Sequence, residues 1–223
     1  MIKLSKRLEA ISSLVPVNAK VIDVGCDHAL LDIYLYQNKI SKKIIATDVN
    51  LNALGNAQEN IKKVKLDKYI ETRLGNGIDP LNSDDDIDTI IMAGMGAHTI
   101  IGILKNNYQK LKNIDNIIIQ SNTKLFFLRK EMMKLNYKID NEVMVLDNKK
   151  IYTIIKYVKG KQKYNKKELY FGPVLLKNNS KLFQEYNKKE LAKLEMKLKL
   201  LPKDKIMMRY KTKREIELYK KIV

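Results

Sequence analysis

The sequence predicts an α/β domain with a mostly parallel sheet that ends in an antiparallel hairpin, followed by a small helical region. Short β-branched runs alternate with longer helical segments over residues 1–159, which is typical of βαβ units. Only four residues, 147–150, separate the last two runs, and so short a connection forms a hairpin. The 223 residues suffice for one such domain and a modest appendage.

Each of the first four strands is an apolar run that ends at a turn residue, in order Gly25, Asp48, Gly75 and Gly94. A fifth, isoleucine-rich run precedes Ser121. We expect seven strands, at 20–24, 43–47, 69–74, 88–93, 116–120, 138–146 and 151–158. The longer segments predict helices at 30–37, 51–64, 98–111 and 125–135. A parallel sheet closed by a hairpin is the arrangement of class I, Rossmann-like methyltransferases, although a fold alone does not give a function.

After residue 159 the composition becomes polar and basic, so we place a boundary between a domain at 1–159 and a second one at 160–223. Four leucines in the second part recur at spacings of three, four and three, which is the seam of a coiled coil, and Pro202 then ends the helix. A second helix is expected from about residue 203, and the two should pack as an antiparallel hairpin. The leucines are Leu191, Leu194, Leu198 and Leu201.

The net charge of +18 favours a polyanionic partner such as RNA. Residues 159–223 carry 20 basic and 7 acidic side chains, so most of the excess lies in the helical region. A lysine-rich, merely solvated surface is the alternative, and the hairpin can equally cover the sheet or form a dimer. The basic residues that we expect to contact RNA are Arg7, Lys161, Lys163, Lys166, Lys167, Lys205 and Arg209.

Several classes of protein are disfavoured by composition. No apolar stretch approaches the length of a membrane span, and the first residues do not resemble a secretory signal. We therefore expect a cytoplasmic protein. Cys26 is the one cysteine and there are two histidines, which makes a metal site unexpected. A monomer is expected, with dimerisation through the hairpin as the alternative.

The turn after the first strand is the place where doubly wound sheets bind nucleotide-like ligands. A dinucleotide fingerprint needs glycine at positions 27 and 30, where this chain has Asp27 and Leu30. A carboxylate there would repel a pyrophosphate at the helix N-terminus. S-adenosylmethionine has no phosphate and carries a sulfonium and an ammonium group, so acidic residues favour it as the cofactor. The alternative is that Asp27 only caps the following helix.

Later strand ends carry matching features. Asp48 stands where an acidic residue accepts hydrogen bonds from ribose hydroxyls. Asn76, between two glycines, can pair with adenine, although a plain turn explains it nearly as well. Residues 93–96 include two glycines and an alanine, so the backbone at this strand end can approach a ligand closely. The full set of expected cofactor-binding residues is Asp23, Gly25, Cys26, Asp27, His28, Asp48, Val49, Asn76, Gly77, Ala93, Gly94 and Met95.

With these motifs in view, the chain resembles the TrmK family, bacterial methyltransferases that modify N1 of adenine 22 in tRNA. The resemblance rests on residues 4–8, 23–29, 75–77, 93–96 and 171–173, and it implies the tRNA substrate and the position. The family typically has Gly-Asp-Gly where this chain has Asn76, and Gln-Pro-Asn where it has Gln120, Ser121 and Asn122.

Adenine N1 is unprotonated at neutral pH, so it can attack the sulfonium methyl without a strong base, and positioning supplies much of the rate. The product base is cationic, so a nearby carboxylate or carbonyl helps. Asp27 is the first catalytic candidate and Asn122 the second, whereas His28 is more often a structural hydrogen-bonding residue. Methylation of another RNA site, a small molecule or a protein remains an alternative, as does an RNA-binding protein on a degenerate fold.

Overall fold

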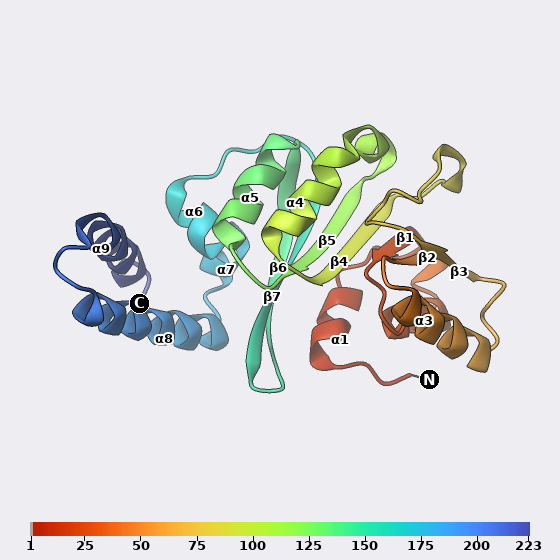
Figure 1. The fold of residues 1–223 in the computed structure, drawn as a ribbon, viewed down its shortest axis with the longest axis horizontal. Coiled ribbons are helices and arrows are strands. Elements are labelled where there is room, and N and C mark those ends of the chain that lie inside the picture. The colour runs from red at the N-terminus through yellow and green to blue at the C-terminus, as the bar shows by residue number, and fades with distance from the viewer. Residues whose placement is uncertain (1) are drawn as a thin grey trace.

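The computed structural model describes residues 2–223, in which a seven-stranded sheet carries helices on both faces (Figure 1). The strand order is β3-β2-β1-β4-β5-β7-β6; the first five strands are parallel, and β7 pairs antiparallel with both β5 and β6. The predicted parallel sheet with a terminal hairpin is confirmed. The strands are β1 Ala19–Val24, β2 Ser41–Asp48, β3 Ile70–Leu74, β4 Thr89–Met95, β5 Asn116–Ser121, β6 Tyr137–Asp147 and β7 Lys150–Lys159.

Helices α1, α2 and α3 pack on one face of the sheet, and α4 and α5 on the other. Both faces of the central parallel strands are therefore covered, which is why β4 and β5 are largely apolar, whereas the edge strand β3 carries Glu71 and Arg73. The helices are α1 Lys6–Ser12, α2 Leu30–Gln37, α3 Leu51–Lys63, α4 Ala97–Asn106, α5 Leu125–Lys134, α6 Lys166–Phe171, α7 Pro173–Asn178, α8 Lys181–Leu200 and α9 Ile206–Lys220.

The helix expected at 98–111 is shorter than predicted. It ends at Asn106, and a 3₁₀ helix spans Tyr108–Asn113. The break lies at Asn107, whose side-chain amide donates to Ile103 O at 3.2 Å and to Asp79 Oδ1 at 2.7 Å. A side chain that bonds the backbone of the preceding turn competes with the helical ladder, and this competition ends the helix.

Helices α1, α6 and α7 were not expected from the sequence. The last two follow the linker-like stretch after Gly160, yet Tyr164 and Leu169 are buried in the main hydrophobic core. Helix α6 packs on α5, and α7 packs on β6. Packing against the sheet therefore continues to about residue 178, and the domain boundary at 159/160 stays a prediction.

Helices α8 and α9 form a hairpin that projects from the end of the sheet (Figure 1). The four seam leucines are half-buried. Arg209 closes the turn, because its guanidinium donates to the carbonyls of Leu198 and Leu201 at the end of α8. The second helix begins at Ile206, three residues later than expected, and coiled-coil packing stays a prediction. Across residues 2–223, none of the helices is sufficiently long and apolar for a membrane crossing.

Candidate active site

The turn between β1 and α2 lies where the strand order reverses, between β2 and β4, which is the usual ligand crevice of such sheets. Gly25 has φ of +76°, and the amides of Gly25 and Cys26 donate to Thr47 O at 2.8 and 3.0 Å. A Cβ at Gly25 would lie 2.7 Å from Met95 Cε. The turn therefore needs glycine, both for its backbone conformation and for the close approach of Met95.

Asp27 and Asp48 meet at this turn. Asp48 Oδ2 accepts from Asp27 N at 3.3 Å, and its Oδ1 accepts from Asn50 N at 2.9 Å. The side chain of Asp27 is exposed, 3.7 Å from His28 Nε2. The alternative that Asp27 caps the next helix is wrong, because that helix begins at Leu30 with Ala29 as its N-cap and no capping side chain. The carboxylate of Asp27 is thus free to meet a ligand.

A second acidic pair lies beneath the turn. Asp23 is 5% exposed and Asp32 is fully buried. Burial, with the nearby Asp48 charge, raises the pKa of Asp23 to about 7, whereas Arg7 opposes the shift. Burial and the charge of Asp23 hold the pKa of Asp32 well above its usual range. Within residues 2–223, no donor reaches either carboxyl oxygen of Asp32. Burial and mutual repulsion therefore favour a proton on one of the two carboxyls, as in other pairs of adjacent buried acids.

This pairing makes the stability of the ligand-free protein pH-dependent. Because the pKa values are raised on folding, the native state binds more protons, so its stability falls as pH rises from about 4 towards 7. We expect Asp32→Asn to remove one titrating group while keeping a donor for Asp23. Chemical unfolding between pH 5 and pH 8 should then show a smaller loss of stability than in the wild type.

The control is Asp67→Asn, the same chemical change at an exposed position. Its pH dependence should match that of the wild-type protein. An Asp32→Asn variant with the wild-type pH slope would show that Asp32 adds nothing to the pH dependence and would contradict the raised pKa of this buried pair.

The ends of β4 and β5 are tied by a closed ring of hydrogen bonds. Gly94 N donates to Gln120 Oε1 at 3.1 Å, Gln120 Nε2 donates to Asn122 Oδ1 at 3.0 Å, and Asn122 Nδ2 donates to Gly94 O at 2.6 Å. Arg7 adds a bond from Nη1 to Gln120 Oε1 at 2.8 Å. Gln120 is almost fully buried. This ring fixes the orientation of the Asn122 amide at the edge of the crevice.

Sequence reasoning missed three residues of this region. Gln120 stands out in the sequence only as the first residue of the motif at 120–122, and Asp32 lies in a predicted helix that is otherwise mostly apolar. A carboxylate in the run Leu30–Leu35 was the available signal, since a buried acid needs an explanation. Arg7 was expected to contact RNA, but it lies beside Gly94, bonded to Gln120 and 5.5 Å from the centre of the Tyr152 ring.

The remaining predicted cofactor residues lie around the same strand ends. Gly77 O accepts from Thr47 Oγ1 at 3.1 Å, which joins the turn after β3 to β2. Asn76 and Val49 are exposed, and Ala93 is half-buried on β4. The sequence therefore identified side chains that the fold brings to one edge of the sheet, and Cys26 is buried under them with its thiol pKa raised by that burial.

The predicted RNA-binding lysines are elsewhere. Lys161, Lys163, Lys166 and Lys167 are exposed around the start of α6, and Lys205 is exposed at the tip of the hairpin. Arg209 lies beside that tip but is engaged in closing the turn. These exposed lysines thus lie at the start of α6 and at the tip of the hairpin, away from the acidic turn after β1.

The chemistry of the crevice fits S-adenosylmethionine. Three carboxyl groups, of Asp23, Asp27 and Asp48, lie near one turn, and the two cationic groups of the cofactor would neutralise negative charge that a phosphate would increase. The bare backbone at Gly25 and Gly94 admits a close ligand. In the described part of the chain, no group of three or more His, Cys, Asp or Glu is arranged to hold a metal ion.

Comparison with known proteins gives one consistent result. The TrmK family model, described as tRNA (adenine(22)-N(1))-methyltransferase, matches residues 21–222. The tRNA (adenine(22)-N(1))-methyltransferase of Bacillus subtilis is 30% identical over 154 residues, which is 69% of this chain and 64% of the length of that relative.

Two solved structures cover nearly the whole chain. Streptococcus pneumoniae Sp1610 in complex with S-adenosyl-L-methionine has a TM-score of 0.92 and 31% identity, over 99% of both chains. M. capricolum TrmK in complex with S-adenosyl-homocysteine has a TM-score of 0.89 and 31% identity, over 98% of this chain and 96% of that one. The resemblance and the cofactor inferred from the sequence are confirmed, and the chain belongs to the TrmK family of S-adenosylmethionine-dependent tRNA methyltransferases.

Proposed function

We propose that the protein transfers the methyl group of S-adenosylmethionine to N1 of adenine 22 in tRNA, with the acidic turn after β1 holding the cofactor and the ends of β4 and β5 holding the adenine. The observation that carries the proposal is the acidic turn itself. Asp27 and Asp48 are linked by a hydrogen bond at its rim, and Met95, from the end of β4, lies against Gly25. Both parts of the site therefore belong to one crevice.

The protein's contribution to cofactor binding is electrostatic and geometric. When bound, the cofactor supplies an electrophilic methyl group on a sulfonium. Asp48 stays free to accept from ribose hydroxyls, because one of its oxygens is only weakly engaged, at 3.3 Å. With one proton on the Asp23–Asp32 pair, one negative charge remains beneath the turn, and it is a partner for a cation above the turn.

Binding of the adenine depends on the ring formed by Gly94, Gln120 and Asn122. Because adenine N1 needs no general base, the residues of this chain act by orienting the adenine and by excluding water. The positive charge that develops on the adenine is favoured by carbonyl and carboxylate oxygens. We assign this role to Asp27 and Asn122, with Gly94 O as a further acceptor. Because N1 lies on the pairing edge, the adenine must be unpaired or extruded before it reacts.

We assign tRNA backbone binding to the exposed lysines at 161–167 and to Lys205, and we place the protein in the cytoplasm as a monomer. The high positive charge of the chain supports binding to the tRNA backbone. Contacts between lysines and phosphates release counterions, so this binding should weaken as the salt concentration rises. A small-molecule substrate would not need this surface. Binding of tRNA that did not weaken as salt rises would favour that alternative.

The test is methylation of unmodified tRNA transcripts by the full chain, followed by mapping of reverse-transcriptase stops, since a methyl at N1 blocks pairing. A new stop at position 22 that requires S-adenosylmethionine is the expected result. A transcript with guanine in place of adenine 22 is the control and should give no stop there. A stop only at another position, or none, would overturn the assignment.

A further inference from the structure

A cavity of about 300 Å³ lies between the sheet and the helical hairpin. One end is the turn after β5, residues 121–124, and the floor comes from β6 and β7. The far wall is aromatic and comes from three helices: Tyr170 on α6, Tyr186 on α8 and Tyr219 on α9. Nothing in the proposed methyl transfer uses this far wall.

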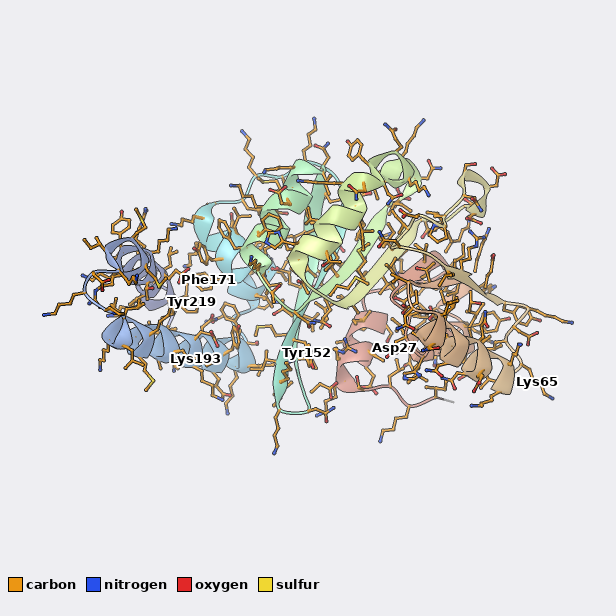
Figure 2. All side chains as sticks on the ribbon, viewed as in Figure 1. Asp27, Lys65, Tyr152, Phe171, Lys193 and Tyr219 are labelled. Atoms are coloured by element: carbon orange, nitrogen blue, oxygen red, sulfur yellow. The ribbon has the colours of Figure 1, made fainter. Side chains whose placement is uncertain are left out.

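The aromatic wall is preformed. Phe126 and Tyr170 lie 4.6 Å apart between ring centres, and Phe171 and Tyr219 are 4.9 Å apart in an edge-to-face pair. Figure 2 shows the latter pair at the base of the hairpin. All four rings line the cavity, and Phe171 is almost fully buried. Aromatic faces held in this way are the surfaces on which proteins stack unpaired nucleobases.

Polar groups line the same cavity. Asn187 lines the cavity from α8; it is buried, and its amide nitrogen donates to Phe183 O of the same helix at 2.8 Å. Thr153 on β7 and Ser121 supply hydroxyl groups. The Asn187 amide nitrogen and the Ser121 hydroxyl already have protein partners, but amide and hydroxyl oxygens can accept further hydrogen bonds, and the edge of a base carries donors for them.

The mouth of the cavity is basic. Lys124 is exposed at the end near β5, and Lys166 Nζ lies 5.9 Å from the centre of the Tyr170 ring. Arg129 lines the cavity, and its charge is neutralised by the buried Glu142 at 2.8 Å. Positive charge at the rim with a neutralised interior suits a base whose phosphates stay at the surface.

The cavity borders the proposed methyl-transfer site at Asn122. Asn122 lines it and, through Nδ2, bonds Gly94 O at the end of β4. A nucleotide that occupied the cavity would therefore lie beside the adenine placed at Asn122. We propose that this cavity binds an unpaired nucleobase adjacent in sequence to the target adenine, so that the enzyme recognises a dinucleotide step rather than one base; this inference rests on the proposed function.

The test combines an RNA change with a protein change. In tRNA transcripts, the nucleotide on the 5′ or the 3′ side of adenine 22 is made abasic, and KM and kcat for methylation are compared for the wild type and for Tyr170→Leu. Loss of one stacked base should raise KM about 10-fold in the wild type on one of the two sides. Tyr170→Leu should raise KM similarly with the intact transcript and show no further effect of the abasic site. Tyr210→Leu, at an exposed tyrosine of α9, is the matched control and should behave as the wild type.

A second readout does not depend on turnover. A 2-aminopurine at the sensitive position should be quenched on binding to the wild-type protein and to Tyr210→Leu, but not on binding to Tyr170→Leu, and calorimetry should show unchanged affinity for S-adenosylmethionine. If the wild type methylates adenine 22 but abasic substitution acts equally on all three proteins, the cavity does not hold the flanking base. A change in sedimentation on Tyr170→Leu would instead make the cavity an interface between copies and would also overturn the inference. Failure of the wild type to methylate any tRNA would count against the proposed function itself.

Discussion

Gln120→Leu is expected to lower kcat for tRNA methylation about 100-fold, because displacement of the groups that orient a reactant by about 1 Å can cost that much. The substitution removes the acceptor for Gly94 N and the donor for Asn122 Oδ1. It also releases the Arg7 guanidinium. Affinity for S-adenosylmethionine should change much less than kcat, since the acidic turn after β1 is untouched. Single-turnover methylation and calorimetry measure the two quantities separately.

A double-mutant cycle with Asn122→Ala shows whether Gln120 acts through Asn122. If it does, Gln120→Leu should cost far less in the Asn122→Ala background than in the wild type, because coupled residues are not additive. Gln120→Glu is the conservative comparison: it keeps an acceptor for Gly94 N but cannot donate to Asn122. Full additivity of the two losses would contradict the role of the ring.

The strands were predictable because their physical signal is local. A parallel strand covered on both faces must be apolar along its whole length, and the isoleucine run 117–119 on β5 has no other explanation. The turn residues after these runs were equally visible, so the acidic turn at Asp27 and its partner Asp48 could be placed before the structure was known. Strand ends in a parallel sheet meet at one edge, and this rule turned separate motifs into a site.

The hydrogen-bonded ring was not predictable, because its contacts join residues far apart in the chain. Gln120 bonds Gly94, 26 residues away, and Arg7, 113 residues away. Arg7 was predicted to contact RNA because of its charge, and charge does not indicate where a side chain lies in the fold. Asp32 lies in a helix that is otherwise apolar, and only the fold shows that its neighbour is a second carboxyl. Pattern reasoning finds faces of elements, whereas these contacts depend on tertiary packing.

The region after Gly160 is packed more closely against the sheet than its polar, basic composition indicates. Its lysines are exposed, as a linker's would be, but Tyr164 between them is buried and donates from its hydroxyl to Gln162 while accepting from Ile139 N at 2.7 Å. The Phe-Gly-Pro motif that supported the family resemblance has a packing reason. Gly172 has φ of +88°, and a Cβ there would lie 2.3 Å from Glu142 Oε2. Glycine at this position makes room for a buried carboxylate.

That carboxylate belongs to the ion pair whose loss should cost the most stability. Arg129 and Glu142 are 1% and 0% exposed and 2.8 Å apart. Arg129 also donates to the carbonyls of Leu169 and Tyr170. Arg129→Met replaces the guanidinium with an unbranched, apolar side chain and leaves Glu142 as an unpaired buried charge. We therefore expect a loss of about 3–5 kcal/mol in the free energy of unfolding. Denaturant unfolding of the full chain measures it.

Two comparisons separate the buried charge from lost packing. Arg73→Met breaks the pair with Asp85, which is less buried, at 18% and 12% exposed, and Asp85 keeps a hydrogen bond from Asn82 N, so the cost should be smaller than at Arg129. Arg129→Met combined with Glu142→Gln removes both charges, while the amide oxygen still accepts from Val174 N as the carboxylate does at 3.0 Å. The double variant should regain at least half of the loss, because an uncompensated charge, rather than the missing pair, is the larger penalty. Equal losses in the single and double variants would instead assign the cost to the carbonyls of α6 and would make Arg129 a backbone anchor for that helix.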